Sequence, residues 1–211
     1  MPYKRTKQPP KHRELVLQFE KAIKGLVRRF RNHPYVFYTE TDMHCYLYHR
    51  LYRGGLINGL YTTAEGHDTI LLHKEYATKA RYRRRPEDGT LEEDRLARGR
   101  GAFDISIWDP LYLSTLEHRK QKVLCAAELA LNECGSKNPH TINDTTKLAD
   151  RGNVKYGYIL FFVRDSKSYE LHKKKVWDNL NKAAKRVRIV FTLVNGNEKP
   201  KPQYLGAWGD I

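Results

Sequence analysis

Asp104 and Glu128 each lie within a segment of this chain that is almost wholly apolar. Asp104 lies within residues 103–110, and Glu128 lies within residues 123–132. Both segments predict buried strands, so each carboxylate falls in the middle of a strand. A buried carboxylate costs several kcal/mol unless it is paired or bound to a cation. Two such groups on neighbouring strands predict a divalent metal site; the alternative is that one or both face solvent at a sheet end.

The composition predicts a single soluble domain, residues 1–211, with a polyanionic partner. Forty per cent of the residues are hydrophobic, which is enough for a sizeable core, and the net charge is +15. This charge favours nucleic acid as the partner, although a generally basic protein remains an alternative. No apolar run is long enough for a membrane span or a secretory signal. Because the three cysteines are odd in number and lack CxxC spacing, we expect reduced thiols and a cytoplasmic location.

The first part of the chain predicts a basic arm and two helices. Residues 1–11 form the arm, and apolar residues at three- and four-residue spacing predict a helix over residues 13–32. A second helix begins at Thr39, where Asp42 completes a capping box. Glu40 falls in its first turn, where it either complements the helix dipole or serves as a site residue.

Two basic loops are candidates for nucleic-acid contact. A strand is predicted over residues 69–78, followed by a long excursion, residues 79–101, without apolar periodicity. The second loop covers residues 114–122. Long loops in compact domains are usually functional or disordered. Their arginines and lysines suit phosphate contact, unless they pair with nearby acids in a solvated loop. The candidates are Arg81, Arg83, Arg84, Arg85, Arg100, Arg119 and Lys120.

The remaining pattern predicts alternating helices and strands. After the strand that holds Glu128 we expect a helix, a strand, a helix and a strand, and then an irregular tail over residues 195–211. Their ranges are 142–151, 156–163, 169–185 and 187–194. An antiparallel meander followed by strand–helix–strand units predicts an α/β fold: a mixed sheet flanked by helices, with residues 1–35 as an N-terminal extension.

These residues together resemble the PD-(D/E)XK nuclease superfamily, which has the restriction-endonuclease-like fold. Glu40 resembles the acid on its first core helix, Asp104 its motif aspartate and Glu128 the acid of its (D/E)-x-K triplet. The segment from Asp144 to Leu148 resembles the helix that follows. The resemblance extends over residues 39–194 and implies a restriction-endonuclease-like core.

The triplet departs from the superfamily pattern at its lysine. It reads Glu128-Leu129-Ala130, whereas the superfamily lysine is thought to activate water and stabilise charge at phosphorus. One such donor is worth on the order of 100- to 1000-fold in rate. Either another lysine replaces it, with Lys147 the first candidate and Lys137 the second, or the site is inactive.

The resemblance implies metal-assisted phosphodiester hydrolysis. Mg²⁺ or Mn²⁺ would be held by Asp104, Glu128 and the backbone carbonyl of Leu129, with Glu40 in support. We therefore expect an endonuclease that acts on DNA rather than RNA. A homodimer is compatible with this expectation. The alternatives are a catalytically silent protein of the same fold that binds nucleic acid without cutting, and an unrelated basic α/β module.

Overall fold

The fold is described from a computed structural model of the chain. The described residues are 9–55, 57–78, 82–84, 91–93, 101–113, 121–131, 139–152, 154–164, 187–193 and 202–205. The predicted helix over residues 169–185 lies outside them.

Among the described residues, six strands form one mixed sheet in the order β10-β9-β8-β7-β6-β3. The antiparallel pairs are β3 with β6, β6 with β7, and β9 with β10, whereas β7, β8 and β9 run parallel. Their bounds are β3 Leu72–Ala77, β6 Ala102–Trp108, β7 Val123–Leu131, β8 Val154–Val163, β9 Val187–Leu193 and β10 Gln203–Leu205. The strands that carry Asp104 and Glu128 are therefore neighbours inside the sheet.

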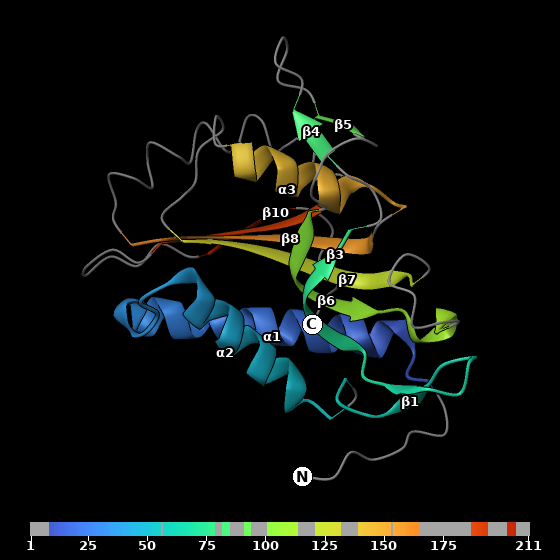
Figure 1. Cartoon of the computed structure of the whole chain (residues 1–211). Helices are drawn as coiled ribbons and strands as arrows, with labels where there is room; N and C mark the ends of the chain where they lie inside the picture. The colour runs from blue at the N-terminus through green and yellow to red at the C-terminus, as the bar shows by residue number, and fades with distance from the viewer. Residues whose placement is uncertain are drawn as a thin grey trace.

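Helices cover both faces of this sheet (Figure 1). On one face lie α1, His12–Asn32, and α2, Glu40–Tyr52, joined through the short 3-10 helix η1, Pro34–Val36. On the other face lies α3, Pro139–Ala149, which connects the parallel strands β7 and β8. The predicted mixed sheet with flanking helices is confirmed.

The apolar stripe predicted for α1 forms the core on its face of the sheet. Phe19 packs on Tyr158 of β8 with ring centroids 5.0 Å apart, and Phe30 packs edge-on against Phe162 at 5.0 Å. These aromatic side chains are fully or nearly fully buried. Burying a side chain of this size contributes about 1.5–3 kcal/mol, so the stripe anchors α1 to the sheet.

On the opposite face, Gly157 allows α3 to lie close to β8. A Cβ atom at this position would lie 2.7 Å from the Cβ atom of Leu148 and 2.8 Å from its carbonyl oxygen. Any larger residue would push α3 outward. This close approach matters because α3 carries Lys147.

Several predicted boundaries are corrected by the structure. The helix expected over residues 142–151 is α3, which begins at Pro139, because proline is well tolerated in a first helical turn. The tail expected to be irregular contains β10, which extends the sheet edge along β9.

Two further segments also differ from the predictions. The strand expected over residues 69–78 is divided into β2, Asp68–Thr69, and β3, since β2 pairs instead with β1, Tyr61–Thr62. The long excursion contains a short hairpin of β4, Tyr82–Arg84, and β5, Leu91–Glu93, beside α3 (Figure 1). Another short 3-10 helix, η2, Pro110–Tyr112, follows β6.

Cys45 and Cys125 are both free thiols. Among the described residues, no helix combines the length and apolar character that a membrane span requires.

A buried ion pair joins α1 to the sheet. Glu20 is fully buried, and its Oε1 atom accepts hydrogen bonds from the Tyr158 hydroxyl at 3.0 Å and from the Arg188 guanidinium. Arg188 also donates to the Tyr158 hydroxyl at 2.9 Å. The charge of Glu20 is thus matched by one cation and one hydroxyl within the chain.

We predict that Glu20→Ala destabilises the fold by about 3 kcal/mol, because removing one partner leaves the other charge poorly solvated. Urea denaturation at neutral pH measures this difference. Lys21→Ala, a change of an exposed residue on the same helix, is the control and should stay within about 0.5 kcal/mol of the wild type. Equal effects of the two substitutions would contradict the prediction.

Candidate functional site

The sheet register brings Asp104 and Glu128 close together on neighbouring strands. Ser106 pairs with Ala126 between β6 and β7, and Asp104 and Glu128 each lie two residues away from these partners. The Leu129 amide donates a hydrogen bond of 2.8 Å to Asp104 Oδ2. The two acids are therefore close neighbours on adjacent strands of the sheet, as the sequence predicted.

The start of α2 is set by its capping box. The Asp42 amide donates to Thr39 Oγ1 at 3.2 Å, and the Thr39 amide donates to Asp42 Oδ2 at 2.7 Å. Glu40 is consequently the first residue of the helix, and His44 follows four residues later. This spacing puts both side chains on one face of the helix.

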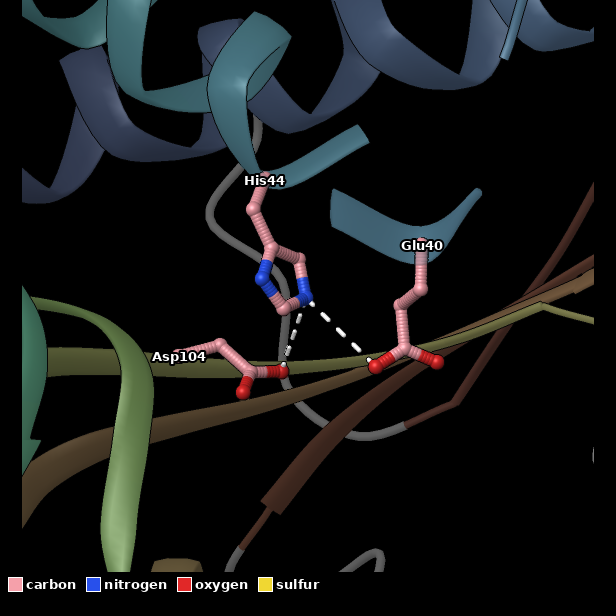
Figure 2. Close-up of side chains that lie close together, drawn as sticks. All are labelled: Glu40, His44 and Asp104. Atoms are coloured by element: carbon pink, nitrogen blue, oxygen red, sulfur yellow. Dashed lines mark ion pairs between the residues drawn. The ribbon is translucent and has the colours of Figure 1, made fainter. Parts of the chain in front are cut away.

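Glu40, His44 and Asp104 converge on one point (Figure 2). His44 Nε2 lies 3.3 Å from Asp104 Oδ2 and 3.7 Å from Glu40 Oε1. One potential ligand atom from each residue lies within 4.8 Å of the others, so this trio could hold a metal ion. We call these three residues the metal trio.

The acidic neighbours of His44 favour its protonated form. Burial by itself lowers the pKa of His44, but the hydrogen bond and charge of Asp104, with the charge of Glu40, outweigh burial and raise it above the ordinary value. The imidazole thus lies in a site that attracts positive charge. A proton or a metal ion can supply that charge.

Lys147 of α3 reaches Glu128 from the helix that covers the other side of the sheet. Its Nζ atom lies 2.8 Å from Glu128 Oε1 and 2.8 Å from Asp144 Oδ1, and it donates to the Ala102 carbonyl at 2.9 Å. Glu128 and Lys147 are both buried. Gly101 makes room for the lysine, because a Cβ atom there would lie 2.8 Å from Lys147 Cδ.

The buried pair holds its protons tightly. Burial raises the pKa of Glu128 well above its ordinary value, and the charges of Asp104 and Asp144 add to this rise, while Lys147 opposes it. Burial by itself lowers the pKa of Lys147, but Glu128 and Asp144 outweigh burial and raise it. Lys147 therefore remains a cation at neutral pH.

Four acids gather around these two basic side chains. We call Glu40, Asp104, Glu128 and Asp144 the carboxylate cluster. Lys147 contacts two of its members, and His44, when protonated, contacts the other two. Carboxylates crowded together in this way favour the uptake of protons or of a further cation.

The predicted site residues have different outcomes. Glu40 and Asp104 meet in the metal trio, while Glu128 is engaged by Lys147, the first candidate for the missing lysine. Leu129 contributes its amide to Asp104. Arg83 and Arg84 lie in β4. The remaining candidates, namely Arg81, Arg85, Arg100, Arg119, Lys120 and Lys137, lie outside the described residues.

Two contacts of the site were missed by the sequence prediction. His44 is predicted only as part of a helix, although its four-residue spacing from Glu40 indicates a shared face. Asp144 lies three residues before Lys147 and contacts it directly. In both cases helical spacing was the available signal.

Scans against protein-family models, curated proteins and solved structures found no match to this chain.

We predict that Mn²⁺ stabilises the wild-type protein through the metal trio, by about 2.7 kcal/mol at a hundredfold excess over Kd. Loss of a ligand in His44→Ala should weaken Mn²⁺ binding at least about tenfold. Thermal denaturation with and without the ion, together with titration calorimetry, measures both effects. His49→Ala changes an exposed histidine of the same helix and should bind like the wild type; an unchanged affinity in His44→Ala would exclude this trio as the site.

Glu128→Gln should gain stability relative to the wild type as the pH rises, in the absence of metal. The pKa of Glu128 in the folded state lies above its ordinary value of 4.5. Between these two pKa values the folded state binds more protons than the unfolded state. The stability of the wild type therefore falls as the pH rises through that range. A tenfold difference in proton affinity between the two states corresponds to about 1.4 kcal/mol. Glutamine removes the charge but still offers an oxygen to Lys147.

Urea denaturation in EDTA from about pH 5 to about pH 8 measures this difference. Glu75→Gln, the same change at an exposed position, is the control. A difference between Glu128→Gln and wild type that stays constant with pH, or favours the wild type as pH rises, would contradict the prediction.

Proposed function

We propose that this protein is a metal-dependent endonuclease with a PD-(D/E)XK-like core. Its substrate would be nucleic acid, with DNA as the first candidate, and it would hydrolyse phosphodiester bonds. The observation that carries the proposal is the contact of 2.8 Å between Lys147 Nζ and Glu128 Oε1. It supplies an ammonium group beside the acid of the triplet, whose own lysine position is Ala130. The cation comes from the following helix instead of the same strand.

The residues around Asp104 suit a divalent metal. Glu40, His44 and Asp104 would hold it, and Glu128 with the Leu129 carbonyl are the ligands that the resemblance implies. Carboxylates alone suit Mg²⁺ and Mn²⁺ equally, but an imidazole nitrogen in the set favours Mn²⁺. A bound divalent ion polarises a phosphate and lowers the pKa of a bound water.

Lys147 acts through its charge. Because its pKa is raised, the ammonium group is a poor general base at neutral pH. Held by Glu128, Asp144 and the Ala102 carbonyl, it has a fixed position before the substrate arrives. A fixed cation of this kind stabilises the negative charge that develops on a phosphate during hydrolysis.

The net charge of +15 supports a nucleic-acid substrate. Because phosphates are bound by charge, affinity should fall steeply with salt and depend little on base sequence. The acidic site itself repels phosphates, so a metal ion is needed there before a phosphodiester can approach.

Plasmid nicking with Mn²⁺ and with Mg²⁺ tests this proposal. Asp104→Asn, Glu128→Gln and Lys147→Met should each lower the rate by about 100-fold or more, because each removes a ligand or a stabilising charge. Lys21→Met makes the same change as Lys147→Met at an exposed position and should cut like wild type.

Two outcomes would overturn the nuclease. Equal cutting by all variants would identify a contaminating enzyme. Absence of cutting by the wild type with either ion, combined with salt-sensitive DNA binding, would identify the catalytically silent binding protein.

A further inference from the structure

Two tyrosines stand exposed in the connection between α1 and α2. Tyr35 is 77% exposed and Tyr38 is 86% exposed, with Val36 between them at 50%. The two tyrosines have the largest exposures among the exposed large hydrophobic side chains of the described residues. Contiguous apolar side chains exposed on a protein surface often mark a binding site.

The connection is held firmly in this exposed conformation. Phe37, which lies between the two tyrosines in the sequence, is buried and packs edge-on against Tyr46 of α2, with ring centroids 5.3 Å apart. The Tyr38 amide donates a hydrogen bond of 2.8 Å to Asp42 Oδ2, and η1 shapes the backbone at Tyr35. The rings are therefore presented by an anchored segment.

Cationic groups accompany these rings. The Arg164 guanidinium lies 5.6 Å from the centre of the Tyr35 ring, and it also donates to the Phe37 carbonyl. The adjoining end of α1 carries the exposed Arg28 and Arg29. We call Tyr35, Tyr38 and Arg164 the aromatic platform.

The aromatic platform adjoins the metal trio. Tyr38 precedes Glu40 by two residues, so their Cα atoms are at most about 7 Å apart. A group bound on the tyrosines would therefore lie beside the carboxylate cluster. Rings next to arginines favour a planar, anionic ligand over an apolar protein surface.

We propose that the aromatic platform stacks an unpaired base of single-stranded nucleic acid and thereby directs its backbone to the metal trio. This inference rests on the proposed function and names its substrate class: single-stranded or locally unpaired nucleic acid. Stacking on tyrosine is tolerant of base identity, since every base offers a planar face. The arginines would contact the flanking phosphates.

Binding without cutting tests the platform. In EDTA, the fluorescence anisotropy of a labelled oligothymidylate is compared with that of an abasic oligomer of the same length, which has the phosphates but no bases. The wild type should prefer oligothymidylate by about tenfold or more, the effect of one or two stacked bases. The double variant Tyr35→Ala/Tyr38→Ala should lose this preference, and Tyr35→Phe/Tyr38→Phe should keep it.

Tyr112→Ala is the matched control, because Tyr112 is a tyrosine exposed on η2, beyond the far end of β6. It should leave the preference unchanged. No preference in the wild type, or the same preference in the double alanine variant, would overturn the platform. A third outcome would also overturn the platform. If the double alanine variant keeps the preference but no longer self-associates in sedimentation, the tyrosines bind a second copy of the chain instead of a base.

Failure of the platform and failure of the proposed function are distinguishable. The binding comparison needs neither a metal ion nor hydrolysis, whereas plasmid nicking needs both. A tyrosine-dependent preference in a protein that does not nick would keep the platform and reject the nuclease. Nicking without the preference would keep the nuclease and reject the platform.

Discussion

The structure depends on the gathering of carboxylates around Asp104 and Glu128. These two acids lie on neighbouring strands of a buried sheet, where negative charge is costly unless a cation balances it. The elements that pack on the sheet near them each bring a basic group, namely His44 from α2 and Lys147 from α3. Asp104 and Glu128 thus link the helices on the two faces of the sheet electrostatically.

The contrast with Glu20 explains why we interpret this cluster as functional. Glu20 is also fully buried, but its Oε1 atom is paired within the chain with the Arg188 guanidinium and the Tyr158 hydroxyl. In the carboxylate cluster, Glu128 lies near the charges of Asp104 and Asp144, and its pKa is raised by burial and by both of them. An arrangement that serves stability alone resembles the Glu20 pair. Buried groups with perturbed pKa values, such as Glu128, are typical of functional sites.

Lys147 reaches the carboxylate cluster from a helix instead of from a strand of the sheet. In the proposed nuclease core, a lysine on β7 itself would reach the site, but the position two residues after Glu128 is Ala130. The close packing of α3 on Gly157 and the space left by Gly101 allow a helix residue to reach the same carboxylate. Fold and site are coupled here, since both glycines permit a contact that a larger residue would obstruct.

The sequence by itself determined which acids are site candidates, where most strands lie, and that helices flank a mixed sheet. Strong local patterns encode these features: the apolar runs around Asp104 and Glu128, the stripe of α1 and the capping box that starts α2. It also indicated Lys147 as a candidate, because that residue follows the third meander strand on a helix. Boundaries were less well predicted, since α3 begins at Pro139, three residues before the predicted start.

Only the tertiary structure decided which side chains meet. His44 enters the site because α2 packs beside β6, and Asp144 enters because α3 packs on β7 and β8. Tyr35 and Tyr38 are available on the surface because the segment buries Phe37 and leaves both tyrosines exposed. Such contacts join residues far apart in the chain, and they depend on packing angles and on register. Local spacing encodes neither of these, so the sequence indicated the chemistry and the fold decided its partners.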